Sequence, residues 1–372
     1  MDLKNIGWDS FFEDHLKQIK NKTKYDYNFL VGRVSAVHTN LCQVLTEGGE
    51  MAAQVSGKMR DKINNETTSP NGEILEPAFP AVGDWVMMIH DQQHNSGMIR
   101  MILPRRTKFS RNAAGVTSQE QVIASNIDYA FIVAALNADF NPSRIERYLV
   151  TAWNSGATPV ILLNKADLCS EVDVKIAEME KTAVGVSVHA ISAARGEGLE
   201  QLSPYLQNGR TSVFIGSSGA GKSTIINRLL GRDIIKVKEI SDYKDKGRHS
   251  TTSREMYILE GGGIVIDTPG MRELQLWEGE QGLSVTFDDI EQFAAQCRFG
   301  DCRHQEEPGC AVRAALESGD INRVRYGNYL KLQRELKYQE SRNNTKVRME
   351  QSKRWKNIAK TRRHLNKDST CR

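Results

Sequence analysis

Eight consecutive residues in the second half of the chain match the phosphate-binding pattern GxxxxGK[ST]. They are Gly216, Ser217, Ser218, Gly219, Ala220, Gly221, Lys222 and Ser223. An apolar run precedes them and a helical pattern begins at Thr224, which is the strand, loop and helix context that this motif requires. Backbone N–H groups can then converge on phosphates at a helix N-terminus, where Lys222 reaches the β- and γ-phosphates and Ser223 binds Mg²⁺. The motif predicts a nucleoside triphosphate site that extends to Thr224.

A second motif of the DxxG type, Asp267 to Gly270, follows the apolar run Ile264 to Ile266. In a switch protein such an Asp holds Mg²⁺ directly or through water, and the Gly N–H senses the γ-phosphate. Taken alone, these four residues would be an ordinary turn. Because they come one strand after a phosphate-binding loop, we expect Asp267 and Gly270 at the nucleotide, with Asp267 as a second Mg²⁺ ligand.

The base must be read elsewhere, because a phosphate-binding loop does not select it. Asn164, Lys165, Ala166 and Asp167 form an NKxD motif at the end of another apolar run. The Asp167 carboxylate can accept hydrogen bonds from N1–H and the exocyclic amine of guanine, a pair of donors that adenine lacks. A helix N-terminus with a capping Asp explains these four residues about equally well when they are considered alone.

A further strand end, at Ser192 and Ala193, can place the Ala193 backbone N–H on guanine O6. Its own specificity is low, but strand position links all these motifs. In a doubly wound sheet the carboxyl ends of the strands meet at one crevice, where ligands bind. The four motifs together therefore predict guanine rather than adenine.

The order of the motifs along the chain is unusual. NKxD and the Ser-Ala turn come first, and the phosphate-binding loop and DxxG follow, whereas in an ordinary GTPase domain the phosphate-binding loop leads. Joining the ends of such a domain and cutting it after DxxG reproduces this order and leaves the neighbours in the sheet unchanged. The sequence thus predicts a circularly permuted α/β domain in which the segment after DxxG continues into the C-terminal region.

Two other patterns flank this domain. From Phe29 to about Pro104 five short strand-like segments alternate with turns, which suggests a small closed barrel such as an OB-fold, with an SH3-like barrel as the alternative. Beyond about Trp277 the pattern is mainly helical. The expected fold is therefore a multidomain chain with an N-terminal β-barrel, a central α/β P-loop domain and a C-terminal helical domain.

Three cysteines and one histidine cluster in the C-terminal region with the spacing C-x4-C-x-H-x5-C. They are Cys297, Cys302, His304 and Cys310. Four nitrogen and sulfur ligands without an open position favour a structural, tetrahedral Zn²⁺. The remaining cysteines are scattered, so a disulfide framework is not expected. Such a metal would hold together a small domain with little core of its own.

The 372 residues have a mild net charge of +4, but residues 341–372 carry eleven Lys or Arg against Glu350 and Asp368. The rest of the chain is therefore net negative, and the basic tail points to a polyanion such as RNA. A solvated tail is the alternative. The first twenty residues lack the apolar core of a signal peptide, and no apolar run is long enough to span a bilayer. We expect a cytoplasmic protein without a membrane partner, and a monomer.

The chain resembles the RsgA family of ribosome small subunit-dependent GTPases over nearly its whole length. The resemblance rests on the barrel ending in Ala81 to Val86, the permuted motif order and the cysteine and histidine cluster. It also rests on Gly247 to Thr252, which is similar to the family's G[KR]HTTT switch motif with Ser250 in place of a Thr. The family implies an OB-fold, a zinc-binding C-terminal domain, and a role in late maturation of the small ribosomal subunit, whose binding stimulates hydrolysis.

Two residue roles follow from this resemblance. His249 stands where the family replaces the water-orienting Gln, and as a neutral imidazole it can accept a hydrogen bond from water. Thr252 is the expected switch threonine that meets Mg²⁺ and the γ-phosphate, with Thr251 as the close alternative. A lone His in a polar segment is otherwise usually solvated surface, so the assignment of His249 depends on the motif around it.

The resulting organisation has six parts. They are an N-terminal extension (1–28), an OB-fold barrel (29–104), a linker (105–118), a circularly permuted GTPase domain (119–278), a zinc-binding helical domain (279–340) and a basic tail (341–372). The expected activity is hydrolysis of GTP to GDP and phosphate, with Mg²⁺ and one structural Zn²⁺, on the small ribosomal subunit. A P-loop ATPase and an RNA-binding nucleotide clamp with incidental hydrolysis are the alternatives.

Overall fold

The computed structural model describes residues 1–22, 29–38, 41–57, 59–60, 79–91, 93–112, 120–138, 140–233, 254–267 and 281–339. The predicted site residues His249, Thr251, Thr252 and Gly270, and the basic tail, lie outside these ranges. The chain divides into two compact units, which are described separately. Unit 1 comprises Met1–Arg111 and Val122–Leu274, and unit 2 comprises Asn112–Gln121 and Gln275–Arg372.

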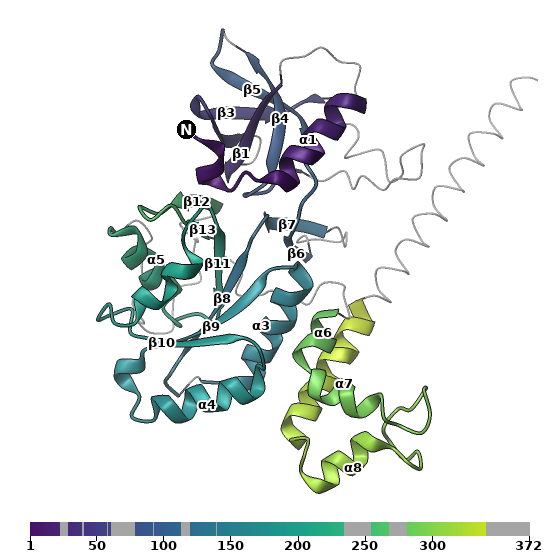
Figure 1. Ribbon diagram of the computed structural model, residues 1–372. Helices are drawn as coiled ribbons and strands as arrows, with labels where there is room; N and C mark the ends of the chain where they lie inside the picture. Colours follow the sequence, from purple (N-terminus) through teal and green to yellow (C-terminus); the bar gives the residue numbers. More distant parts are fainter. Residues whose placement is uncertain are drawn as a thin grey trace, which may run out of the picture. The chain divides into compact units, whose positions relative to one another are not determined.

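Five strands near the N-terminus form a closed barrel (Figure 1). They are β1 (Leu30–Val37), β2 (Cys42–Thr46), β3 (Gly49–Val55), β4 (Trp85–Asp91) and β5 (Ser96–Ile102). The strand order is β1-β2-β3-β5-β4, and β4 pairs with β1 to complete the ring. Strands β3 and β5 are parallel, whereas the other neighbours in the ring are antiparallel. This closed order is that of the predicted OB-fold.

The central sheet of unit 1 has the strand order β10-β9-β8-β11-β13-β12. Its strands are β8 (Tyr129–Ala135), β9 (Thr158–Asn164), β10 (Ser187–Ile191), β11 (Thr211–Gly216), β12 (Arg254–Ile258) and β13 (Ile264–Asp267). All neighbours are parallel except β12, which runs antiparallel to β13. The strand that leads into the phosphate-binding loop, β11, lies between strands that precede it in the chain and strands that follow it. This arrangement confirms the circular permutation.

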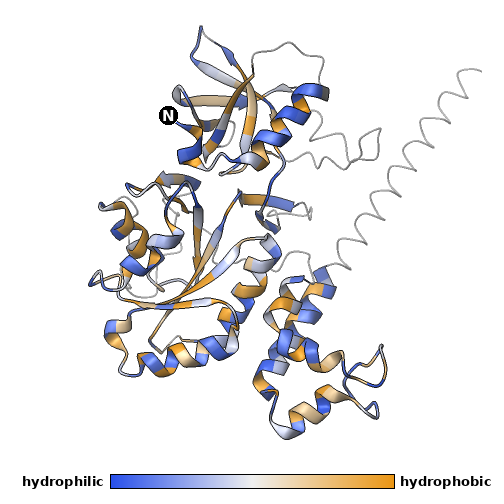
Figure 2. Ribbon diagram, in the orientation of Figure 1, coloured by the Kyte–Doolittle hydropathy of each residue, from blue (hydrophilic) through white to orange (hydrophobic). Residues whose placement is uncertain are grey.

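Both faces of this sheet are covered by other elements. Side chains alternate between the two faces along each strand, so each face contributes its own apolar residues to a core. One face of β8 presents Ala130 and Ile132, which share a core with residues of α3 (Pro142–Ser155) and α4 (Val172–Thr182). The opposite face presents Phe131 and Val133, which share a second core with α5 (Lys222–Leu230) and the 3₁₀ segment η3 (Leu199–Tyr205). Helices α3 and α4 combine hydrophobic and hydrophilic residues, as expected of helices that cover a sheet (Figure 2).

The barrel and the central sheet are joined by hydrogen-bonded strands as well as by packing. Strand β1 pairs with β12, with Ala36 opposite Glu255, so the two parts form one continuous sheet of eleven strands. The N-terminal residues add to the same core through the 3₁₀ turn η1 (Leu3–Ile6) and helix α1 (Ser10–Lys22), with Ile6 and Phe12 buried in it. A short ribbon of β6 (Lys108–Asn112) and β7 (Glu120–Ser125) connects the two parts along the chain.

The side chain of Arg33 is buried at this junction. It donates hydrogen bonds to the carbonyl oxygens of Ile6 (2.6 Å), Gly83 (3.2 Å) and Asn126 (3.0 Å), which belong to the N-terminal turn, the barrel and the segment before β8. Burial lowers the pKa of Arg33 to about 10, so the guanidinium remains charged at neutral pH. One buried cation therefore links three parts of unit 1 that are distant in the sequence.

The described part of unit 2 from residue 281 onward is helical. It contains α6 (Gln281–Thr286), α7 (Asp288–Ala294), α8 (Ala311–Ser318) and a helix over residues 323–339. Arg325 binds both carboxylate oxygens of Asp289 at 2.8 and 2.9 Å and the Thr286 carbonyl at 2.8 Å, which ties α7 to the last helix. Across the described residues of both units, no helix has the length and apolar character needed to cross a membrane.

Candidate functional site

The phosphate-binding loop connects the end of β11 to the start of α5, as the sequence predicts. Gly216 has φ +144°, and a Cβ there would lie 2.2 Å from the Val133 carbonyl oxygen, so no larger residue fits. At Gly221, with φ +98°, a Cβ would lie 2.1 Å from the Asn164 amide nitrogen. The two glycines thus allow the loop to pass directly against β8 and the NKxD motif.

The Lys222 ammonium group points back over this loop. It donates to the carbonyl oxygens of Gly216 at 2.8 Å and Ser217 at 2.6 Å. The contacts hold the charge above the loop, beside the backbone N–H groups that would surround a phosphate. Ser223 and Thr224 follow in the first turn of α5 and are partly exposed.

Asn164, the first residue of NKxD, connects the base motifs to the phosphate-binding loop. Its amide nitrogen donates to the Ala220 carbonyl at 2.8 Å, and its amide oxygen accepts from the Ala193 N–H at 3.0 Å. The side chain is almost completely buried. Three of the predicted motifs therefore meet at one amide, even though they are separated by as many as 56 positions in the chain.

Asp167 lies beside the Ser-Ala turn. The Ser192 hydroxyl donates to Oδ1 of Asp167 at 2.7 Å, and the guanidinium Nε of Arg195 lies 3.8 Å from Oδ2. Lys165 has φ +64°, which is unusual for a residue other than glycine, and it begins the 3₁₀ turn η2 (Ala166–Leu168). This turn of the backbone brings the carboxylate of Asp167 back towards Ser192.

Asp267 ends β13, the parallel neighbour of β11. Ile266 is paired with Val213, so the register places Asp267 at the level of Phe214, two residues before the phosphate-binding loop begins at Gly216. The other residues predicted for the γ-phosphate side, Gly270, Thr252 and His249, are outside the described ranges. The structure thus brings the base and phosphate portions of the predicted site into contact and places Asp267 at the end of the strand next to β11.

Arg228 is a residue of this site that the sequence did not reveal. It lies in the last turn of α5 and donates to the carbonyl oxygens of Ala193 at 3.2 Å and Ala194 at 2.7 Å. An arginine in a helix that faces solvent gives no signal of such a role. Its partners are 35 and 34 positions away, so only the folded sheet reveals the contact.

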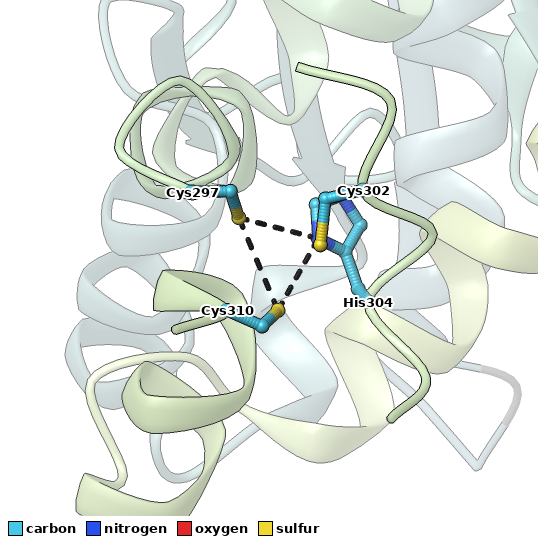
Figure 3. A group of neighbouring side chains, drawn as sticks. All are labelled: Cys297, Cys302, His304 and Cys310. Atoms are coloured by element: carbon cyan, nitrogen blue, oxygen red, sulfur yellow. Dashed lines mark hydrogen bonds between the residues drawn. The ribbon is translucent and has the colours of Figure 1, made fainter. Parts of the chain in front are cut away.

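In unit 2 the four residues predicted to hold a metal converge, with their ligand atoms all within 4.8 Å of one another (Figure 3). His304 Nδ1 lies 3.5 Å from Cys297 Sγ and 3.4 Å from Cys310 Sγ, and the two sulfurs are 3.9 Å apart. With Zn–S of about 2.3 Å and Zn–N of about 2.0 Å, a tetrahedral site has S···S near 3.8 Å and S···N near 3.5 Å. The cluster is therefore consistent with zinc.

Glu307 organises the loop that carries His304. Its carboxylate accepts from the backbone N–H groups of Arg303 (3.1 Å), Gln305 (2.9 Å) and Glu306 (3.1 Å). Hydrogen bonds from its own N–H and from those of Gln305 and Arg303 lower the pKa of Glu307 to about 2. The carboxylate is thus charged at any pH near neutrality, and it stabilises the turn in which His304 adopts φ +59°.

Comparison with known proteins agrees with this geometry. The family model described as RsgA GTPase matches residues 102–277. The small ribosomal subunit biogenesis GTPase RsgA 2 of Lactiplantibacillus plantarum is 49% identical over 311 residues, which cover 83% of this chain and 84% of that protein. The small ribosomal subunit biogenesis GTPase RsgA of Opitutus terrae is 43% identical, and the match covers 96% of each chain.

Two crystal structures share the fold. YjeQ from Thermotoga maritima superimposes with a TM-score of 0.61 and 28% identity over 83% of this chain and 98% of that one. YloQ, described as a circularly permuted GTPase, has a TM-score of 0.58 and 23% identity over 85% of this chain and 98% of that one, and this likeness concerns the fold alone. The permuted sheet, the joined motifs and these relatives lead to one conclusion: the chain belongs to the RsgA family and is a GTP hydrolase.

Proposed function

We propose that this protein hydrolyses GTP to GDP and phosphate while bound to the small ribosomal subunit, and that it acts late in maturation of that subunit. Within the site, Asp167 would bind guanine, and Gly216 to Thr224 would bind the phosphates. The relatives named as small ribosomal subunit biogenesis GTPases support this partner. The observation on which the nucleotide site depends is the double hydrogen bond of Asn164, which joins the base and phosphate motifs at one place.

The proposed chemistry follows from the placement of these groups. Lys222 would leave the carbonyls of Gly216 and Ser217 for the β- and γ-phosphates, and Ser223, Thr252 and Asp267 would hold the Mg²⁺, which neutralises charge that develops on the phosphate oxygens. A water molecule attacks the γ-phosphorus, the bond to the β-phosphate oxygen breaks, and GDP leaves. His249, as a neutral imidazole, would accept a hydrogen bond from this water and orient it.

Guanine would lie against the Ser-Ala turn. Ser192 donates to Oδ1 of Asp167 and so fixes the carboxylate that would accept N1–H and the exocyclic amine. The Ala193 N–H donates to Asn164 in the structure, so it would have to leave the Asn164 oxygen to donate to guanine O6. Gly270 would add its N–H at the γ-phosphate.

Turnover with separated ribosomal subunits tests the proposed partner. We expect slow GTP hydrolysis by the protein alone, little change with large subunits, and at least a tenfold increase with small subunits, because the catalytic arrangement would be completed only on the partner. Phosphate release is the measurement. Equal stimulation by both subunits, or none, would contradict the proposal.

In the same assay His249→Ala should abolish the stimulation while GTP affinity stays normal, and undiminished turnover would remove His249 from the mechanism.

We also propose that Cys297, Cys302, His304 and Cys310 bind one structural Zn²⁺. Purified protein should contain about one zinc per chain by atomic emission. Cys302→Ser should lose most of it and lower the melting temperature of unit 2, because a thiolate ligand is removed from a small helical unit. Cys42→Ser, far from the cluster in sequence and located in β2, is the matched control. Full zinc content in Cys302→Ser would contradict the assignment.

A further inference from the structure

The turn after β10 is held by hydrogen bonds from three directions. Asn164 holds the Ala193 N–H, and Glu197 accepts the Ser192 N–H through its carbonyl at 2.9 Å. The third contact comes from α5, where Arg228 donates through Nε to the Ala193 carbonyl and through one terminal nitrogen to the Ala194 carbonyl. The helix that begins at the phosphate-binding loop thus also binds the turn proposed to face the base.

The chemistry of Arg228 suits this contact. A guanidinium presents several N–H groups in a rigid planar fork and can bind two adjacent carbonyls at once, whereas an ammonium group is a single point of charge on a flexible stem. The two carbonyls belong to consecutive residues, so their binding fixes the orientation of the peptide unit between them. This peptide unit contains the Ala194 N–H and directly follows the Ala193 N–H.

We propose that Arg228 is a positioning residue for guanine, which holds the Ser192 to Ala194 turn against the phosphate-binding helix and so sets where the Ala193 and Ala194 N–H groups lie relative to the purine O6. The proposal rests on the nucleotide site described under Proposed function. It adds a physical connection between the two halves of that site, because the base turn and the phosphate helix cannot separate without breaking the Arg228 contacts. Nucleotide release therefore depends on a side chain that touches neither the base nor the phosphates.

The expected consequence is faster release of guanine nucleotides. Losing two hydrogen bonds, partly replaced by water, should raise the GDP dissociation rate of Arg228→Ala roughly five- to twentyfold. Arg228→Lys can reach one carbonyl at a time and should fall between the wild type and the Ala variant. Arg232→Ala is the matched control, since Arg232 follows closely in the chain and its side chain makes no hydrogen bond within the described residues.

6-Thio-GDP differs from GDP only at position 6 of the base, so it distinguishes loss of the O6 contact from a general loosening of the nucleotide site. GDP, inosine diphosphate and 6-thio-GDP are compared by displacement kinetics on each variant. Inosine diphosphate keeps O6, so Arg228→Ala should raise its dissociation rate by the same factor as that of GDP. The sulfur of 6-thio-GDP is a poor acceptor, so the substitution should raise the dissociation rate of this nucleotide much less. An equal rise for 6-thio-GDP, or an unchanged GDP dissociation rate in both Arg228→Ala and Arg228→Lys, would overturn the proposal.

Wild-type binding of GDP and ADP completes the experiment. If the wild type does not prefer GDP to ADP, the proposed nucleotide site itself is wrong. If it does prefer GDP but the Arg228 variants release it at the wild-type rate, only the role of Arg228 is wrong. Melting curves of the nucleotide-free variants show whether each variant is folded. If Arg228→Ala is unfolded, the comparison is made between the wild type and Arg228→Lys.

Discussion

Asp167→Asn is expected to change the preference of the protein from guanine to xanthine nucleotides. In the proposed site the Asp167 carboxylate accepts two hydrogen bonds from guanine, whereas the amide of an Asn would donate one and accept one. Xanthine has a carbonyl in place of the exocyclic amine, so it matches the Asn pattern and mismatches the carboxylate. GTP affinity should fall by about a thousandfold, because polar groups in the complex would be left without partners.

The geometry around Asp167 suggests that the substitution leaves the site intact. The Ser192 hydroxyl donates to Oδ1 of Asp167 at 2.7 Å, and the Oδ1 of an Asn can accept the same hydrogen bond. Affinities for GTP and XTP, and turnover with each, are the measurements. Asp173→Asn, an exposed change in the first turn of α4, is the matched control and should preserve GTP binding. Tight GTP binding by Asp167→Asn without a gain for XTP would contradict guanine recognition at this residue.

The central sheet could be predicted because each of its motifs lies at the end of an apolar strand. The segment before Gly216 is completely buried, as is most of the strand before Asn164, and the two strands contain the apolar runs Val213 to Ile215 and Pro159 to Leu163. Parallel strands end at one edge, so motif order along the chain was sufficient to infer a permuted domain. The relation of Asn164 to Ala220 could not be inferred, because nothing local in NKxD indicates which carbonyl its amide binds.

The barrel was predictable as a set of strands but not as one topology. The five segments are short and separated by turns, which is compatible with an OB-fold or an SH3-like barrel. What distinguishes them is pairing at long range, namely β3 with β5 and β4 with β1. Such pairings depend on which strand edges remain free as the chain folds, and the residue pattern of a single strand does not indicate its partner.

The junction inside unit 1 was not predicted at all. Arg33 lies within an apolar strand, where a lone charged residue usually faces solvent, yet its partners are 27, 50 and 93 positions away. The N-terminal extension gave no sign that Ile6 and Phe12 complete the core beneath the barrel. The boundaries of the six predicted parts remain predictions, although the barrel and the central sheet belong to one compact unit.

An ion pair at this junction gives the largest expected effect on stability. Asp84 is completely buried and accepts two hydrogen bonds from Arg105, at 2.7 Å from Nε and 2.6 Å from a terminal nitrogen. The Ser125 hydroxyl and the Ala81 N–H donate to the same carboxylate at 2.6 and 2.8 Å. Arg105→Ala leaves a buried charge without its partner and should lower the free energy of unfolding of unit 1 by about 3–5 kcal/mol.

The double variant Asp84→Asn with Arg105→Met decides whether the loss comes from the unpaired charge. Ser125 and Ala81 donate to different oxygens of the Asp84 carboxylate, so the single amide oxygen of the Asp84→Asn side chain keeps only one of these two hydrogen bonds. The side chain is then neutral, however, and Met retains much of the arginine stem, so the double variant should still be more stable than Arg105→Ala alone. Urea unfolding followed by tryptophan fluorescence reports on Trp85, which is buried next in the chain to Asp84. Arg100→Ala, an exposed change in β5, is the control and should shift the transition little. If Arg105→Ala behaves like Arg100→Ala, the ion pair contributes nothing to the junction, and the connection of the barrel to the central sheet depends on apolar packing and strand pairing alone.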